Sequence, residues 1–228
     1  MHSVGHTGGM PDSDEVTTQN STLEQWTRAL SESVGSPGGG AGAGVMLAMA
    51  ASLTSMVAGY SHAQPHQRDT LHEVRARAHE LRRTALQLAD EDAEASHAFG
   101  AAFKLQRGPQ RDDAIRGASL DAAATSSAVG ERATEAIDDL SWLSTHGNPA
   151  LIADVVVAFG ALRAAVTGAR TNVSFDLATL RSSGATLDQI HRQHPRLWTR
   201  VETFDAAISR IDVCVAEVDH RAAPTDSH

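Results

Sequence analysis

An apolar stripe with helical spacing runs along residues 67–106 and constrains the fold more than any other feature of the chain. Its members recur every three or four residues: Leu71, Val74, Ala78, Leu81, Ala85, Leu88, Ala95, Phe99 and Ala102. This period places the side chains on one face of a long helix, where they form a packing seam against neighbouring helices. Aromatic residues make up only 4% of the chain and alanine is abundant, which favours packed helices over a sheet. We therefore predict an all-α fold.

Prolines and glycines divide the rest of the chain into further helical segments. The predicted helices cover residues 21–34, 37–61, 67–106, 110–145, 149–181 and 186–220, and Pro195 can interrupt the last of them. The sequence contains no internal repeat. The simplest organisation is one domain over residues 21–220, flanked by mobile tails at 1–20 and 221–228.

The segment between Ser33 and Gln67 contains no Asp, Glu, Lys or Arg. Its helical part could be mistaken for a membrane span, but it is largely Gly, Ala and Ser, and such small residues suit close contact between helices in a bundle. We therefore predict a buried core helix and no membrane association.

Charge and cysteine content narrow the class of protein further. The net charge of −9 argues against a nucleic-acid surface, which needs clustered Lys and Arg. Cys214 is the only cysteine, so no intrachain disulfide can form, and residues 1–20 lack the apolar segment of a signal peptide. We expect a cytoplasmic protein.

The long apolar seam contains one charged residue, Asp92, which stands between Leu88 and Ala95. Burying an unpaired carboxylate costs roughly several kcal/mol unless the group is neutralised, paired or beside a cavity. Two interpretations stay open. Asp92 forms a structural salt bridge with an arginine of another helix, or it belongs to a functional site and has a raised pKa.

The helix predicted over residues 149–181 carries polar residues near both ends. Asp154 and Asn172 are eighteen residues apart, so they point the same way but lie roughly 27 Å apart along a straight helix axis. We therefore expect them to serve different places. Asp176 follows Asn172 by one turn, and these two side chains can act together.

Three segments carry a resemblance to a known family when they are read together. They are Ser-Pro-Gly-Gly-Gly with the small-residue helix that follows (36–58), the acidic Asp-Glu-Asp-Ala-Glu-Ala (90–95), and the Gly-Asn, Asp and Gly-Ala-Arg-Thr-Asn-Val blocks at 147–148, 154 and 168–173. In order and spacing, over about residues 21–181, the chain resembles the formiminotetrahydrofolate cyclodeaminase and methenyltetrahydrofolate cyclohydrolase family.

The resemblance implies an up-and-down bundle of about six to eight helices that acts as a homodimer. It also implies a tetrahydrofolate derivative as substrate, whose one-carbon bridge between two nitrogens is closed with loss of ammonia or opened with water. Asp92 would be the principal acid–base or electrostatic group, Asp154 a second catalytic candidate, and Asn172 with Asp176 would contact the ligand.

Two further groups of residues complete the candidate site. Gly38, Gly39 and Gly40 allow backbone N–H groups to approach a ligand at a helix N-terminus, although the same glycines can serve only to let helices pack. His62 follows the small-residue helix and is a candidate proton carrier. The commoner role of a histidine there is contact with the free carbonyl groups of the helix end.

The chain departs from the family pattern at several polar positions. Residues 59–64 contain no lysine, while Ala150, Ala153 and Asp176 stand where the family has Asn, Ser and Asn. These departures leave open a repurposed or non-catalytic fold that binds another small ligand. A second alternative is a di-metal bundle, because residues 94–97 and 217–220 both match Glu-x-x-His. Neither pair has clear inward-facing partners, so we expect no metal.

Overall fold

The computed structural model describes residues 16–33, 35–62, 64–182 and 184–222. Eight α-helices follow one another in this part of the chain: α1 (Leu23–Leu30), α2 (Gly39–Gly59), α3 (Arg68–Phe103), α4 (Pro109–Glu135), α5 (Ile137–His146), α6 (Ile152–Ser182), α7 (Leu187–Gln193) and α8 (Pro195–Ala222). Two short 3-10 turns precede α3 and α6, namely η1 (Pro65–Gln67) and η2 (Pro149–Leu151). The described residues contain no strand, and the prediction of an all-α fold is confirmed.

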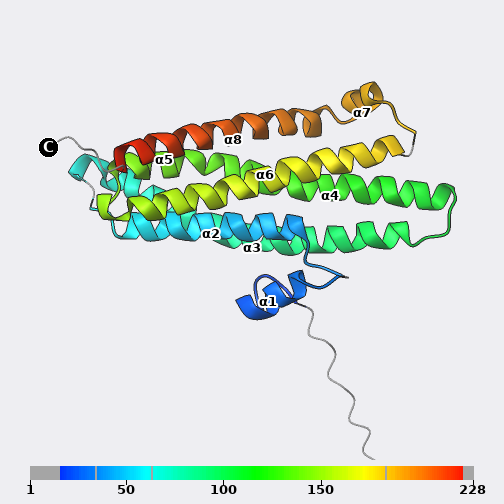
Figure 1. The fold of residues 1–228 in the computed structure, drawn as a ribbon, viewed down its shortest axis with the longest axis horizontal. Coiled ribbons are helices and arrows are strands. Elements are labelled where there is room, and N and C mark those ends of the chain that lie inside the picture. Colours follow the sequence, from blue (N-terminus) through cyan, green and yellow to red (C-terminus); the bar gives the residue numbers. More distant parts are fainter. Residues whose placement is uncertain (1–15, 34, 63, 183, 223–228) are drawn as a thin grey trace, which may run out of the picture.

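The long helices run up and down beside one another (Figure 1). α2 packs on α3 and α6, and α4 packs on the same two helices, so these four form the centre of the bundle, while α8 packs on α6 and α4. α2 is shorter than its neighbours, so α3, α4 and α6 continue beyond its N-terminus (Figure 1). The end of α2 therefore lies inside the bundle, between helices that extend past it.

Large apolar side chains of the central helices and α8 make up the core. The fully buried ones include Leu47, Phe159, Leu162, Phe204 and Ile211. Burying each such side chain stabilises the fold by on the order of 1.5–3 kcal/mol. The seam predicted on α3 is part of this core, with Val74, Ala78, Ala85 and Leu88 buried.

Small residues let α2 approach its two neighbours closely. A Cβ atom added to Gly44 would lie 2.8 Å from the Cβ of Ala89 on α3, and one added to Gly168 on α6 would lie 3.0 Å from the Cβ of Ala43. Both distances are shorter than ordinary van der Waals contact, so a larger side chain at either glycine would force the helices apart. This packing accounts for the Gly and Ala content of α2.

Two helices, α2 and the segment Pro149–Ser182, are long and apolar enough to cross a membrane by length and composition. Both are central helices of the bundle, where α2 packs on α3 and α6. An apolar composition is what a core helix requires, and it does not by itself indicate a membrane span.

Two helix boundaries differ in how well the sequence predicts them. The break at Pro195 is confirmed, because α7 ends before it and α8 begins with it. The segment 110–145 was expected to be one helix, but it divides at Ala136, whose N–H donates to the carbonyl of Ala133 (3.3 Å) in a tighter 3-10 turn. No Gly or Pro marks that point, so the sequence carries no ordinary signal for it.

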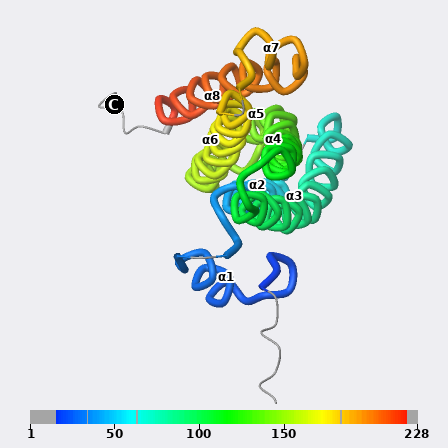
Figure 2. Tube along the Cα trace, turned by 90° about the vertical axis from the view of Figure 1, so that its right-hand side faces the viewer, coloured from blue at the N-terminus to red at the C-terminus, as the bar shows by residue number. Residues whose placement is uncertain are grey.

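The N-terminal helix α1 lies against α2 and α3, outside the bundle (Figure 2). Trp26 is buried there on Ala41 and Ala89, and its indole N–H donates to the hydroxyl of Thr18 (3.0 Å). The backbone N–H of Thr18 in turn donates to the Asp90 carboxylate on α3. Residues 16–20, predicted to be tail, thus contact α3, while residues 1–15, 34 and 223–228 of the predicted tails and first helix lie outside the described residues.

Candidate active site

Two buried carboxyl groups mark the candidate site, at the level where α2 begins. Asp92 of α3 is 3% exposed, and Asp176 of α6 is 7% exposed. They lie close enough for the charge of Asp92 to act on Asp176. Burying two acidic groups together is costly, so their presence in a bundle core indicates a role beyond packing.

Hydrogen-bond donors surround Asp92 on three helices. The hydroxyl of Ser126 on α4 donates to Oδ1 (3.2 Å), and that of Ser96, one turn along α3, donates to Oδ2 (3.5 Å). The backbone N–H of Ala41, in the first turn of α2, is a third donor. Within the described chain no arginine or lysine lies within 4.0 Å of this carboxylate, so the salt-bridge interpretation of Asp92 is wrong.

The two carboxyl groups differ in how readily they ionise. Burial raises the pKa of Asp92, and the donors Ser126, Ala41 N–H and Ser96 oppose that rise. Burial raises the pKa of Asp176 to about 7, and the nearby charge of Asp92 adds to the rise. No hydrogen bond to Asp176 offsets it among the described residues. The pair therefore favours one proton near neutral pH, with Asp92 as the carboxylate and Asp176 as the carboxylic acid.

The three glycines at the start of α2 have different surroundings. A Cβ atom on Gly40 would overlap the Asp92 carboxylate, so only glycine allows this close approach. Gly38 and Gly39 have no neighbour that a Cβ atom would meet within 4 Å, and they face open space. The positive end of the α2 dipole points at the same place and stabilises an ionised Asp92.

A hollow of about 420 Å³ lies between the end of α3, the first turns of α4 and the C-terminal part of α6, and neither Asp92 nor Asp176 lines it. Phe175 on α6 and Phe103 at the end of α3 line it and are 63% and 43% exposed. Arg111 lies over the Phe103 ring, with its guanidinium carbon 5.6 Å from the ring centroid. Exposed aromatic rings of this kind can stack on a planar ring of a ligand. Asn172, half-buried on α6 one turn before Asp176, lies near the same end of the bundle.

Asp154 and His62 lie far from this place. Asp154 is in the first turn of α6, twenty-two residues before Asp176, which corresponds to about 33 Å along the helix. His62 is exposed after the C-terminus of α2, at the end opposite Gly40. Within one protomer, neither Asp154 nor His62 can therefore contact the same ligand atom as Asp92. The position of Asp154 agrees with the expectation that Asp154 and Asn172 serve different places.

The Glu-x-x-His pairs do not form a metal site in the described residues. Glu94 and His97 are exposed on α3, and Glu217 and His220 are exposed on α8. No group of three or more His, Cys, Asp or Glu side chains that could hold a metal ion occurs in this part of the chain. The di-metal alternative therefore has no ligand set here.

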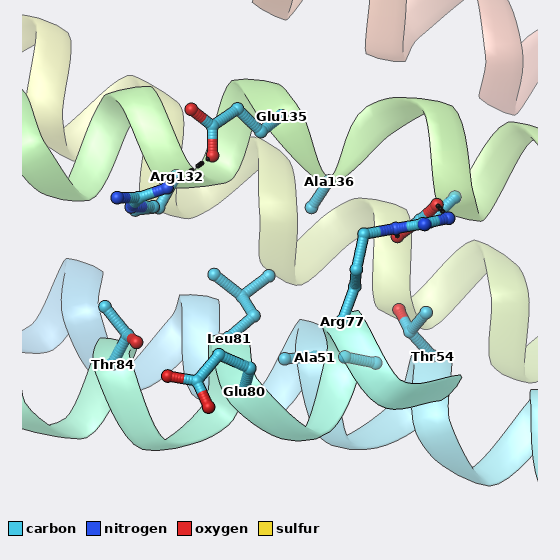
Figure 3. A pocket seen from close by; sticks show the side chains of 11 residues that line it. Ala51, Thr54, Arg77, Glu80, Leu81, Thr84, Arg132, Glu135 and Ala136 are labelled. Atoms are coloured by element: carbon cyan, nitrogen blue, oxygen red, sulfur yellow. Dashed lines mark hydrogen bonds and ion pairs between the residues drawn. The ribbon is translucent and has the colours of Figure 1, made fainter. Parts of the chain in front are cut away.

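Another hollow, of about 280 Å³, lies between α3 and the α4–α5 segment (Figure 3). Its two arginines already have acidic partners. Arg77 donates to both carboxylate oxygens of Asp139 (3.1 and 2.8 Å), and Arg132 donates to Glu135 (2.9 Å). Since these charges are neutralised within the protein, the hollow offers little to a charged ligand.

The fold and the site together define an all-helical bundle with a buried acid–base pair at the start of a glycine-rich helix. Comparison with known proteins gives the family. The family model described as formiminotransferase-cyclodeaminase matches residues 22–192, so the chain belongs to this family and the resemblance predicted from sequence is confirmed. The chain is 29% identical over 162 residues to a methenyltetrahydrofolate cyclohydrolase of Methylorubrum extorquens, a match that covers 68% of this chain and 78% of that protein.

The fold also matches a solved structure. The crystal structure of formiminotetrahydrofolate cyclodeaminase from Thermotoga maritima is similar with a TM-score of 0.74 at 21% identity, covering 89% of this chain and 96% of that chain. This likeness supports the helical bundle as the fold of the family.

Proposed function

We propose that this protein makes or breaks a carbon–nitrogen bond in a tetrahydrofolate one-carbon adduct. The reaction is either closure of the one-carbon bridge with loss of ammonia or opening of that bridge by water. The observation that carries the proposal is the pair Asp92 and Asp176, one group suited to accept a proton and the other to donate one at neutral pH. Family membership and the cyclohydrolase relative support the substrate class.

In the hydrolytic direction the carboxylate of Asp92 stabilises the cationic bridge carbon and accepts a proton from the attacking water. The carbon–nitrogen bond then breaks as the acid Asp176 gives its proton to the leaving nitrogen and takes the proton of the new hydroxyl group. The proton on Asp92 returns to solvent, so the pair ends as it began. Ring closure uses the same groups, with Asp92 deprotonating the attacking nitrogen and Asp176 protonating the departing ammonia.

The remaining site residues have supporting roles in this proposal. Asn172 is a positioning residue, because its amide lies one turn from Asp176 on the same helix. Gly38 and Gly39 provide backbone at the open side of the site, where a carbonyl or carboxylate of the ligand would meet the N-terminus of α2.

A direct assay tests the function. The purified full-length chain is mixed with methenyltetrahydrofolate, whose loss is followed by absorbance, and with formiminotetrahydrofolate, whose released ammonia is measured. We expect one of the two reactions to run at least about 100-fold faster than without protein, the contribution typical of positioned acid–base groups. Rates equal to the uncatalysed ones, together with no saturable binding of any reduced folate, would instead favour a repurposed fold for another ligand.

We also propose that the protein is a homodimer joined through one apolar surface, here called the α2–α6 face. It consists of exposed small or apolar side chains on two adjacent helices: Met46, Met49, Val157, Gly160 and Ala164. α2 carries no charge, and two arginines of α6 turn toward α8, where Arg163 pairs with Asp212 and Arg170 with Asp205. An uncharged face of this kind suits a second copy of the chain.

A charge placed in the α2–α6 face should separate the protomers. We expect Val157→Asp to convert a dimer to a monomer in light scattering after size exclusion, because the new carboxylate would be buried without a partner at the interface. Val213→Asp on α8 is the matched control, since both valines are 58% exposed in the protomer. An unchanged dimer in Val157→Asp, or a monomeric wild type, would refute this interface.

A further inference from the structure

Among the buried hydroxyl groups of the described residues, only that of Ser126 donates to a side chain of another helix. Thr54, Ser61 and Ser119 donate to the carbonyl group four residues earlier in the chain, at 2.8, 2.7 and 2.7 Å. This contact is the ordinary use of a serine or threonine hydroxyl in or at the end of a helix. Ser126 instead donates from α4 to Oδ1 of Asp92 on α3 (3.2 Å). Its hydroxyl therefore serves the Asp92 carboxylate and not its own helix.

The surroundings of Ser126 offer no substitute for this donor. Ser126 and Asp92 are each 3% exposed, so solvent has little access to the contact between them. Ala123 lies one turn before Ser126 on α4 and Gly130 one turn after it, and neither has a side chain that can donate. Ser96, which makes the longer contact with Asp92 (3.5 Å), is exposed, so water can replace its hydroxyl. Loss of the Ser126 hydroxyl would leave a buried carboxylate oxygen without its side-chain donor.

The helix of Ser126 packs on the helices of both acids. α4 contacts α3 and α6, and Asp176 of α6 is the ionisable group that faces Asp92. α2 carries no titratable side chain, and Glu131 of α4 pairs with Arg200 of α8. Asp92 accepts from donors on α2, α3 and α4, whereas no hydrogen bond to Asp176 occurs in the described part of the chain. Because a donor favours the ionised form of the acid it contacts, this asymmetry decides which acid keeps a shared proton.

We propose that Ser126 is a positioning residue, whose hydroxyl holds the Asp92 carboxylate in one orientation and keeps the shared proton on Asp176. The inference rests on the proposed function, because it names the group that prepares Asp92 to accept a proton. It also gives α4 a part in a site that Gly40, Asp92 and Asp176 otherwise build from α2, α3 and α6. The donor is in place before a substrate binds, so the carboxylate does not have to reorient during the reaction.

Kinetics of Ser126→Ala test this role, since the change removes the hydroxyl and keeps the rest of the side chain. We expect kcat on the active folate substrate to fall about tenfold, with KM within about twofold of the wild type. The acidic limb of the pH–rate profile should move to higher pH, because the ionised form of Asp92 loses a donor. Ser126→Cys, whose thiol is a weak donor of similar size, should shift the profile in the same direction and serves if the alanine variant does not fold.

Ser127→Ala is the matched control. Ser127 is adjacent in sequence and 5% exposed, but its hydroxyl donates to Glu131 on its own helix (3.3 Å). This variant should keep kcat within about twofold of the wild type and leave the pH–rate profile unchanged. Equal changes in Ser126→Ala and Ser127→Ala would mean that the loss comes from disturbed packing of α4, and would overturn the proposal.

Carbon-13 NMR of aspartate-labelled protein gives a measurement that does not depend on turnover. The carboxyl signal of Asp92 is assigned by its absence in Asp92→Asn, and its titration is then followed in each variant. We expect Ser126→Ala, and not Ser127→Ala, to move this titration to higher pH. That shift without any folate turnover would support the role of Ser126 in the acid pair and count against the proposed reaction alone. An Asp92 titration that is the same in Ser126→Ala and the wild type would overturn the role of Ser126, whatever the folate assays show.

Discussion

Asp92→Asn is expected to lower kcat at least about 100-fold on the active folate substrate, because an amide cannot accept the proton that the carboxylate takes. The asparagine side chain has nearly the same shape and keeps an oxygen that can accept from Ser126 and from the N–H of Ala41. The fold should therefore persist. Steady-state kinetics and thermal unfolding of the same sample provide the two measurements.

A neighbouring carboxylate supplies the control for this prediction. Glu94→Gln changes an exposed acid two residues further along α3, and it should leave kcat within about twofold of the wild type. Gly40→Ala also tests the Asp92 carboxylate, because the added methyl group must displace it. Gly42→Ala is the control, since its methyl group meets nothing within 4 Å. Activity close to wild type in both Asp92→Asn and Gly40→Ala would remove Asp92 from the mechanism.

Asp176→Asn is expected to stabilise the protein at pH 8 by about 2 to 4 kcal/mol and to slow the reaction. The folded state raises the pKa of Asp176 to about 7 from an ordinary value of 3.8, so it holds a proton that the unfolded chain has released between these pH values. The contribution of Asp176 to the free energy of unfolding is therefore fully present below about pH 4 and is lost as the pH rises through 7. The neutral amide avoids that loss but cannot donate the proton needed by the leaving nitrogen.

Chemical denaturation at several pH values measures this effect. The stability difference between Asp176→Asn and the wild type should shrink toward zero near pH 4 and reach its full size above pH 7. Asp113→Asn, which changes an exposed aspartate on α4, should show no such dependence. A difference that does not vary with pH would mean that Asp176 does not hold a proton in the folded protein.

Much of the fold and part of the site follow from local sequence patterns. The seam on α3 predicts both the long helix and the burial of Asp92, because a charge within an apolar stripe has to enter the core with its neighbours. The one-turn spacing of Asn172 and Asp176 likewise predicts that they share a helix face. These inferences succeed because helical period fixes direction without knowledge of the partner helices.

The parts that sequence could not supply depend on contacts between distant segments. Ser126 lies thirty-four residues after Asp92, and nothing in its own neighbourhood indicates that its hydroxyl meets that carboxylate. The aromatic hollow joins Phe103 and Phe175, which are still further apart in the chain. Asp176 could be placed on a face, but its proximity to Asp92 depends on how α3 and α6 are packed around α2.

Helix α2 contributes no titratable side chain to the pH dependence of this protein's activity. Residues Gly39–Gly59 include no side chain that gains or loses a proton, and the amide groups of the first turn hold the same partial charge throughout the working range. The electrostatic field of this helix at its two ends therefore does not change with pH. An inflection in a rate profile between pH 4 and 8 therefore does not arise from α2, and two inflections from the Asp92–Asp176 pair would belong to the pair and not to either residue alone.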